Sequence, residues 1–305
     1  MSERELLVSK RDPGELLTHA VLFGIAMVSA SITVFILIFF VIESSSFFLA
    51  PGFSLREFVT GTSWRPAVGD FGLLPLLLPT IVIAIIAIGV AMPMGISLAV
   101  VISEYASPRV RRIVRIVLEV FSGIPTVVFG YFALTKLTPF LQGILGVQRL
   151  EPFNLLSAGI TVGLLITPYA FTMLEERFSR IPAVVREAPI SIGATRFEAF
   201  RKTVLPAAER TIRTTMVLSF ARAIGESMIV SLAAGSGSIL TANPLRGAET
   251  MTGYIVRISS GGLTIGTVDY TSIFGLAIVL YLLTIGSILV ASRRSRSAGM
   301  FRRAR

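Results

Sequence analysis

Four long uncharged stretches constrain what this chain can fold into. They cover 24, 27, 20 and 21 residues: His19–Ile42, Leu76–Ile102, Leu155–Leu174 and Thr271–Ala291. Each meets the roughly 20 residues that a helix needs to cross the hydrocarbon core of a bilayer. Only 15% of the 305 residues are charged, against about a quarter in an ordinary soluble domain. We therefore expect an all-α, polytopic membrane protein.

Two less uniform segments bring the expected number of membrane helices to six. Ile116–Leu134 carries Glu119 near its start, and Thr214–Ala234 carries Arg222 and Glu226. Even with these charges, both segments are long enough and apolar enough to cross the bilayer. An even number of crossings places both termini on the same side of the membrane.

The basic residues indicate which side that is. Of 28 Lys and Arg, three precede the first helix, four lie between the second and third, eight between the fourth and fifth, and six follow the sixth. Because cytoplasmic loops are enriched in basic residues, both termini are predicted to be cytoplasmic. The expected organisation is a cytoplasmic tail (1–18), a six-helix domain (19–291) with a long cytoplasmic loop (175–213), and a basic cytoplasmic tail (292–305). The net charge of +10 is thus attributed to orientation and contact with anionic lipid, with no nucleic-acid partner expected.

Several functional classes are disfavoured by composition. The chain has no cysteine and one histidine, which argues against a metal site or a histidine-based catalytic triad. Glu226 is the only acid near the middle of a span, so paired catalytic acids are missing as well. No Gly-Lys dipeptide occurs, hence no phosphate-binding loop of the Walker A type. We expect no enzyme activity, no catalytic residue, no metal and no cofactor.

The predicted outer segment between the first two helices is rich in aromatic residues. Within Glu43–Phe71 these include Phe47, Phe48, Phe53, Phe58 and Trp64. Aromatic side chains gather at membrane interfaces, so an interfacial belt is the favoured interpretation. Docking of an external partner is the alternative.

Arg222 and Glu226 are the candidate functional pair. They are residues 9 and 13 of a 21-residue span, within roughly 3 Å of its midpoint at 1.5 Å rise per residue. An ionisable residue at that depth costs about 2.5–3.5 kcal/mol and marks a functional site by default. In a continuous helix the i,i+4 spacing would let the two side chains pair. One hypothesis is a structural salt bridge. The other is that Arg222 binds a passing anion through its planar donors, with Glu226 orienting and partly neutralising it.

The long cytoplasmic loop has the composition of ordered structure. Around Gly193, good helix formers alternate with Ile192, Phe197, Phe200 and Val204. Gly193 is expected to be a turn or C′ residue between two short helices set at an angle.

This loop resembles the EAA loop of ABC importer permeases. The matching residues are Glu187, Ala188, Gly193, Leu205 and Pro206, while Pro189 replaces the family's second alanine. We expect Pro189 to lie in the first turn of a helix, where proline is tolerated. The resemblance implies the type I (MetI-like) permease fold, and that this loop forms coupling helices that dock on a separate ATPase subunit.

Further segments narrow the resemblance to the PstC branch of the phosphate permeases. They are Glu57–Pro66, Ile102–Ala106, Gly123–Gly130, Ser191–Arg196 and Ala221–Met228. The resemblance implies a prokaryotic inner-membrane subunit that forms a heterodimer with a PstA-like permease. It also implies two PstB-like ATPases, a PstS-like external phosphate-binding protein, and a phosphate path past Arg222 and Glu226.

A second function remains open on the residues alone. A secondary transporter or channel for another oxyanion could use Arg222 and Glu226 as an ion relay and would need no ATPase. An Arg-Glu pair does not by itself distinguish phosphate from sulfate, arsenate or molybdate.

Overall fold

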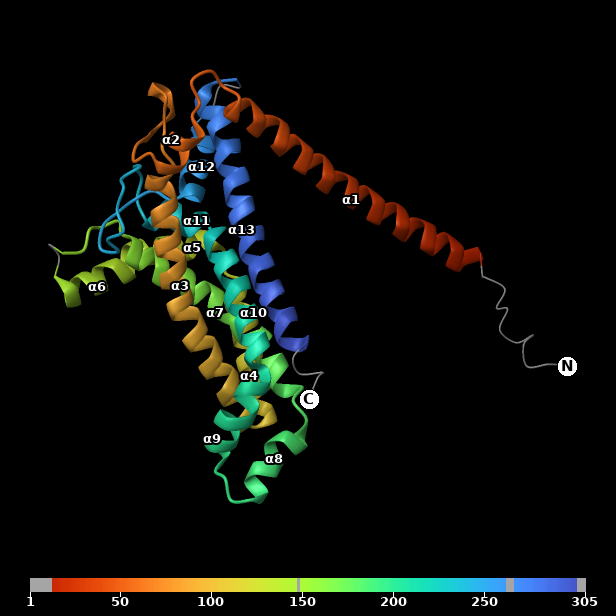
Figure 1. The fold of residues 1–305 in the computed structure, drawn as a ribbon. Coiled ribbons are helices and arrows are strands. Elements are labelled where there is room, and N and C mark those ends of the chain that lie inside the picture. Colours follow the sequence, from red (N-terminus) through yellow and green to blue (C-terminus); the bar gives the residue numbers. More distant parts are fainter. Residues whose placement is uncertain (1–12, 147–148, 262–265, 301–305) are drawn as a thin grey trace.

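The chain is almost wholly helical in the computed structural model, which describes residues 13–146, 149–261 and 266–300 (Figure 1). The helices are α1 (Pro13–Phe48), α2 (Leu55–Thr60), α3 (Leu74–Val100), α4 (Pro108–Ser122), α5 (Thr126–Phe132), α6 (Thr138–Leu145), α7 (Leu155–Ser179), α8 (Ala183–Ser191), α9 (Arg196–Ala199), α10 (Leu205–Ile224), α11 (Met228–Ala233), α12 (Met251–Ser260) and α13 (Val268–Met300). Two short strands, β1 (Trp64–Arg65) and β2 (Asp70–Phe71), pair in antiparallel fashion. The all-α prediction is confirmed.

Five helical segments are long and apolar enough to cross a membrane. They are Leu17–Phe48, Leu74–Tyr105, Thr126–Leu145, Leu155–Ser179 and Val268–Leu289. The 20-residue α10 packs among α3, α7 and α13 as the sixth membrane helix. Both terminal helices extend past their expected ends, because α1 begins at Pro13 and α13 continues to Met300. The rest of the two predicted tails, 1–12 and 301–305, lies outside the described residues.

The prediction that Ile116–Leu134 forms one continuous helix is wrong. α4 ends at Ser122, and a new helix starts at Thr126 after Pro125, whose ψ of 137° is extended. Proline also disfavours helical geometry in the residue before it, which explains the break. From Thr126 the helix runs on through a π-helical turn into α6. The membrane span is therefore displaced toward the C-terminus, and α4 is a separate amphipathic helix.

α3 and α7 form the tightest helix pair. A Cβ on Gly163 would lie 2.7 Å from the Cβ of Val90, and one on Gly159 would lie 2.7 Å from the Cβ of Ile86. Lower down, a Cβ on Gly95 would lie 2.9 Å from Ala170 Cβ. Small residues allow this close approach, and van der Waals packing drives helix association in lipid. The two helices thus form the closely packed centre of the bundle.

The core of the bundle is divided into two stacked apolar clusters. The outer one includes α3 up to Ala91, α7 up to Ile166, and the α10–α11 region from Ala223. The inner one begins at Met92 in α3 and Ala170 in α7. At the boundary between the clusters, Pro168 interrupts the hydrogen bonding of α7, and Pro93, directly after Met92, interrupts that of α3. In α10 the same layer holds Thr215 and Ser219, which are buried and whose hydroxyl groups have no hydrogen-bond partner in the described chain.

The aromatic outer segment forms a core, so the belt interpretation is wrong for its central residues. Phe47, Phe58 and Trp64 are buried, and Trp64 packs edge-on to Tyr254 of α12 with ring centroids 5.6 Å apart. Phe53 packs against Phe47 in the same cluster. Aromatic rings that pack edge to face bury large areas with specific geometry. This end of the bundle is therefore closed by a compact aromatic cap.

The β1–β2 hairpin of this cap is held by an ion pair. Arg65 and Ser63 both donate hydrogen bonds to Oδ2 of Asp70, the shortest being 2.6 Å from Arg65 Nη2. These bonds, from Arg65 first and then Ser63, lower the pKa of the Asp70 carboxyl from 3.8.

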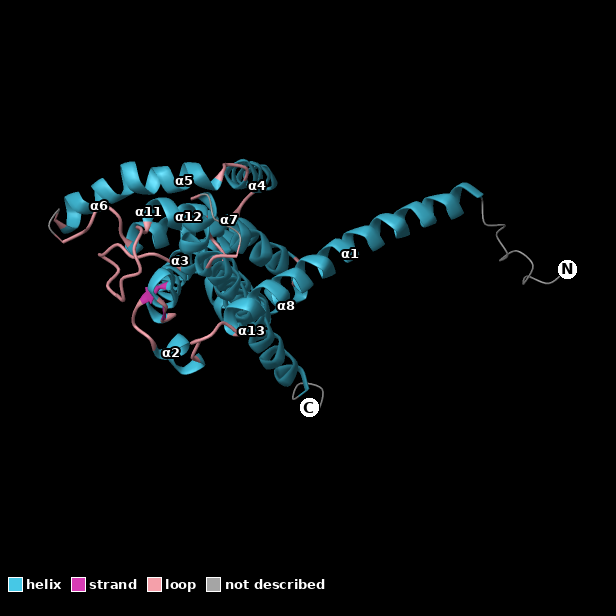
Figure 2. Ribbon diagram, turned by 90° about the horizontal axis from the view of Figure 1, so that it is seen from above, coloured by secondary structure: helices cyan, strands magenta, loops and turns pink. Residues whose placement is uncertain are grey.

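α1 departs from the rest of the bundle. Its C-terminal end lies against α13, where a Cβ on Gly275 would clash with the ring of Phe47. The remainder projects away from the other helices in both views (Figures 1 and 2). Its described apolar side chains are largely exposed within this chain.

Candidate functional site

The fifth predicted helix, Thr214–Ala234, is interrupted where the candidate pair lies. α10 ends at Ile224, and α11 starts only at Met228. Gly225 closes α10 by donating its N–H to the carbonyl of Ala221 at 3.2 Å. Loss of helix at mid-membrane is tolerated only where other parts of the protein satisfy the freed backbone groups.

α12 supplies that support from the outer side. The hydroxyl of Thr252 donates a 2.7 Å hydrogen bond to the backbone carbonyl of Glu226. Nearby, the buried carboxylate of Glu249 pairs with Arg257, with an Oε1–Nε distance of 2.5 Å. The interruption between α10 and α11 is thus fixed in place.

Arg222 lies in the last turn of α10. Its guanidinium carbon is 5.5 Å from the ring centroid of Tyr169 in α7. In the described part of the chain, no hydrogen bond or ion pair to protein engages its N–H donors, and the side chain is exposed within this subunit. A cation at a helix C-terminus is favoured by the helix dipole, which helps to explain how Arg222 is tolerated there.

Glu226 does not pair with Arg222, contrary to the sequence expectation. Its Oε1 instead accepts a 3.3 Å hydrogen bond from the N–H of Ile229 in the first turn of α11. The i,i+4 rule requires a continuous helix, and the helix stops between the two residues. Each charge is therefore stabilised by the helix end of opposite polarity, and the N–H donors of Arg222 have no protein partner in the described part of the chain.

The long loop 175–213 forms the predicted pair of short helices. α8 ends at Ser191 with Ile192 as its C-cap, and Gly193 follows as the predicted C′ residue with a φ of +95°. Glycine adopts this left-handed conformation without steric cost. Thr195 and Glu198 then form a capping box that begins α9. The expectation for Pro189 is wrong, because α8 starts at Ala183 and Pro189 lies near its end.

The other residues of the motif are divided between the tip and the base of this loop. Glu187, Ala188 and Gly193 are exposed at the tip, whereas Leu205 and Pro206 form the first turn of α10. Exposed apolar side chains surround the tip: Val184, Ile190, Ile192 (87% exposed) and Phe197 (61%). An apolar surface of this kind on a short helical element is typical of a protein interface.

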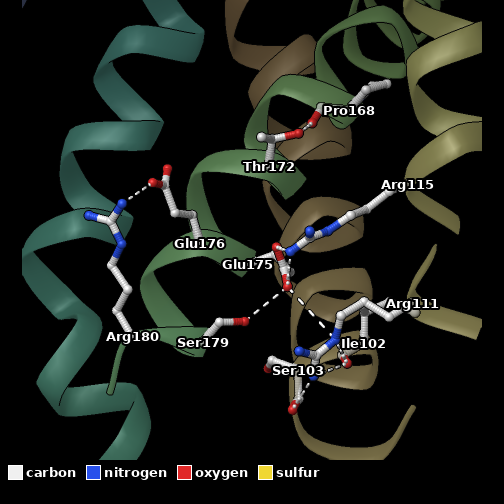
Figure 3. Close-up of polar contacts among 10 residues, drawn as sticks. All are labelled: Ile102, Ser103, Arg111, Arg115, Pro168, Thr172, Glu175, Glu176, Ser179 and Arg180. Carbon is white, nitrogen blue, oxygen red and sulfur yellow. Dashed lines mark hydrogen bonds and ion pairs between the residues drawn. The ribbon is translucent and has the colours of Figure 1, made fainter. Parts of the chain in front are cut away.

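The sequence did not predict a cluster of buried charges that lies behind the loop. Glu175 of α7 is 3% exposed and binds Nη2 of Arg115 at 2.7 and 2.9 Å. It also accepts a 2.9 Å bond from the hydroxyl of Ser179 (Figure 3). Arg111 donates to the backbone carbonyls of Ile102 and Ser103 at the end of α3. Together these contacts attach α4 to α3 and α7.

A second ion pair attaches the tip of the loop to the bundle. Nε of Arg186 in α8 lies 3.1 Å from Oε1 of Glu104, just after α3. Arg186 also donates to the carbonyl of Phe178 in α7. The only sequence signal for these pairs was that acids follow apolar runs directly, which does not identify partners 60 or more residues away.

An interrupted membrane helix with an unpaired arginine, joined to an exposed helical loop, is the architecture of a membrane-integral transport subunit. Residues 91–296 match the family model of the binding-protein-dependent transport system inner membrane component. The chain belongs to this family.

The names of similar proteins agree with this family assignment. The chain is 30% identical to the probable ABC transporter permease protein YqgH of Bacillus subtilis, over 95% of this chain and 94% of that one. It is 28% identical to the phosphate transport system permease protein PstC of Mesorhizobium japonicum, covering 79% and 77%. A probable PstC of Methanocaldococcus jannaschii is 29% identical, covering 72% and 76%.

Solved structures show the same fold. A bacterial alginate ABC transporter matches with a TM-score of 0.66 at 17% identity, over 95% of this chain and 98% of that one. The MetNI methionine ABC transporter matches with a TM-score of 0.57 at 17% identity, over 72% and 92%. The predicted MetI-like permease fold is therefore confirmed.

Proposed function

We propose that this chain is a permease subunit through which an ATP-binding cassette importer moves inorganic phosphate into the cytoplasm. The observation that carries the proposal is the free guanidinium of Arg222 beside a mid-membrane helix interruption. Guanidinium donors match phosphate oxygens, and discontinuous helices mark substrate sites in many transporters. The PstC relatives supply the identity of the anion.

The proposed partners follow from surfaces that this chain leaves uncovered. The apolar tip of the α8–α9 loop, with Glu187, Ala188 and Gly193, is the docking surface for an ATPase, one on each of two permeases. The projecting α1 and the exposed Arg222 are suited to a second permease of PstA type that completes the path. A PstS-like protein would deliver phosphate to the outer end. In this arrangement the tails and the 175–213 loop face the cytoplasm of a prokaryotic cell.

The test is ATP-dependent uptake of radiolabelled phosphate by the complete importer in proteoliposomes. Arg222→Gln removes one charge-assisted contact worth about 1.5–3 kcal/mol, so uptake is expected to fall roughly 10- to 150-fold. Arg213→Gln is the matched control, because Arg213 lies on the same helix but already pairs with Glu209. Unchanged uptake by Arg222→Gln would refute the proposal. Uptake driven by a proton gradient with this chain alone would favour a secondary transporter instead.

A further inference from the structure

Arg222 needs a device that holds it in place without consuming its donors. Glu226 was the sequence candidate, but its carboxylate caps α11. A carboxylate bound to Arg222 would also compete with any anion for the same N–H groups. The described structure offers one other group in contact with the guanidinium, the ring of Tyr169.

We infer that Tyr169 is the positioning residue for Arg222, holding the guanidinium over its ring so that the donors stay available to the transported anion. This inference rests on the proposed function. The face of an aromatic ring attracts a cation through its quadrupole and accepts none of the in-plane hydrogen bonds that guanidinium uses for oxyanions. The aromatic ring thus takes the orienting role that Glu226 was expected to have.

The ring sits on a tightly packed helix. Tyr169 follows Pro168 in α7, the helix that packs tightly on α3, and its ring is partly buried against the outer apolar cluster. The hydroxyl of Thr172 bonds the carbonyl of Pro168 at 2.9 Å (Figure 3). α7 therefore carries both Tyr169, which contacts Arg222, and Glu175, which binds α4 through Arg115.

The cation–π interaction makes a graded prediction for phosphate uptake. A cation–π contact between a protein cation and an aromatic ring changes an equilibrium by about two- to thirtyfold, depending on how dry the site is. Tyr169→Phe keeps the ring and is expected to transport within about twofold of the parent. Tyr169→Leu removes it, and uptake is expected to fall by about three- to thirtyfold. Tyr281→Leu is the control, because Tyr281 is exposed on α13 and has no ring or cation contact in the described chain.

Fluorinated phenylalanines at position 169 separate this role from simple packing. Added fluorines weaken the negative ring face step by step while the side chain keeps nearly the same size. We expect uptake by the assembled importer to fall with each fluorine, whereas a packing role predicts a flat series. This series remains decisive even if Tyr169→Leu fails to assemble.

The outcomes distinguish this inference from the proposed function. If Arg222→Gln abolishes uptake but the fluorinated series is flat, or Leu equals Phe, the positioning role is overturned and the phosphate proposal stands. If Tyr169→Phe loses as much uptake as Tyr169→Leu, the hydroxyl is the functional group and the inference is again wrong. If Arg222→Gln transports normally, both fail.

Discussion

Removing the charge of each partner of the Glu175–Arg115 ion pair in turn should give unequal losses of stability. The carboxylate of Glu175 is buried, whereas the Arg115 side chain is 50% exposed. Arg115→Gln therefore leaves a buried charge with only Ser179 bonded and Arg111 at 4.0 Å. Glu175→Gln removes the buried charge and leaves an arginine that can reach solvent or headgroups.

The expected size of each loss follows from what is left unpaired. Removing one partner of a buried ion pair typically costs 3–5 kcal/mol because the other charge stays buried. Since Arg111 lies close enough to compensate in part, about 3 kcal/mol is expected for Arg115→Gln. Glu175→Gln loses a charge-assisted hydrogen bond but keeps a neutral acceptor for Ser179, so about 1–2 kcal/mol is expected. Glu176→Gln is the matched control, because Glu176 is 53% exposed and pairs on the surface with Arg180; its loss should stay below about 0.5 kcal/mol.

The assay is reversible unfolding of the purified subunit in detergent micelles, monitored by circular dichroism across an SDS titration. The order Arg115→Gln, then Glu175→Gln, then Glu176→Gln is the signature of a buried acid with an exposed base. Equal losses for the first two variants, or a control as damaging as either, would refute the reasoning.

Three further outcomes are expected. Gly163→Val should prevent accumulation of folded protein on immunoblots of membranes, since a Cβ there lies 2.7 Å from a side-chain carbon of α3, whereas Gly89→Ala meets nothing within 4 Å and should accumulate normally. Gly193→Ala should cost about 1–2 kcal/mol for its left-handed φ and lower phosphate-coupled ATP hydrolysis by the assembled importer; unchanged coupling would contradict a docking role for this turn. Because Arg65 lowers the pKa of Asp70 below 3.8, the stability from that carboxylate is present above this pH and is lost as pH falls through the lowered value. An acid titration of the single tryptophan's fluorescence should therefore show a transition that Asp70→Asn removes.

The membrane helices and the cytoplasmic loop could be predicted because their signals are local. Uncharged runs give the spans, and Gly193 alone indicates the turn that its φ of +95° requires. Where helices are interrupted was harder to predict. Pro125 breaks the third span, but the equally placed Pro93 and Pro168 lie inside continuous helices. A proline permits a break, and tertiary packing decides whether it occurs.

The surroundings of the candidate residue Arg222 differ from those that the sequence predicted. Arg222 is conspicuous in any hydropathy reading, but its partner Tyr169 lies 53 positions earlier, and no local pattern connects the two. The pairing with Glu226 failed because a periodicity rule was applied across a helix end. Likewise, Trp64 and Phe47 were assigned to the membrane interface because composition does not reveal that they meet α12 and one another.

The division of the core into two apolar clusters has a mechanical consequence. The layer at their boundary contains Pro93 and Pro168, each of which frees a backbone carbonyl four residues earlier, and the unpartnered hydroxyls of Thr215 and Ser219. Because these two prolines remove backbone hydrogen bonds from α3 and α7, bending in this layer breaks fewer hydrogen bonds than bending elsewhere along the two helices. We expect the subunit to flex as two stiff blocks about a joint at mid-bilayer, with the aromatic cap moving with the upper block and the helical loop with the lower.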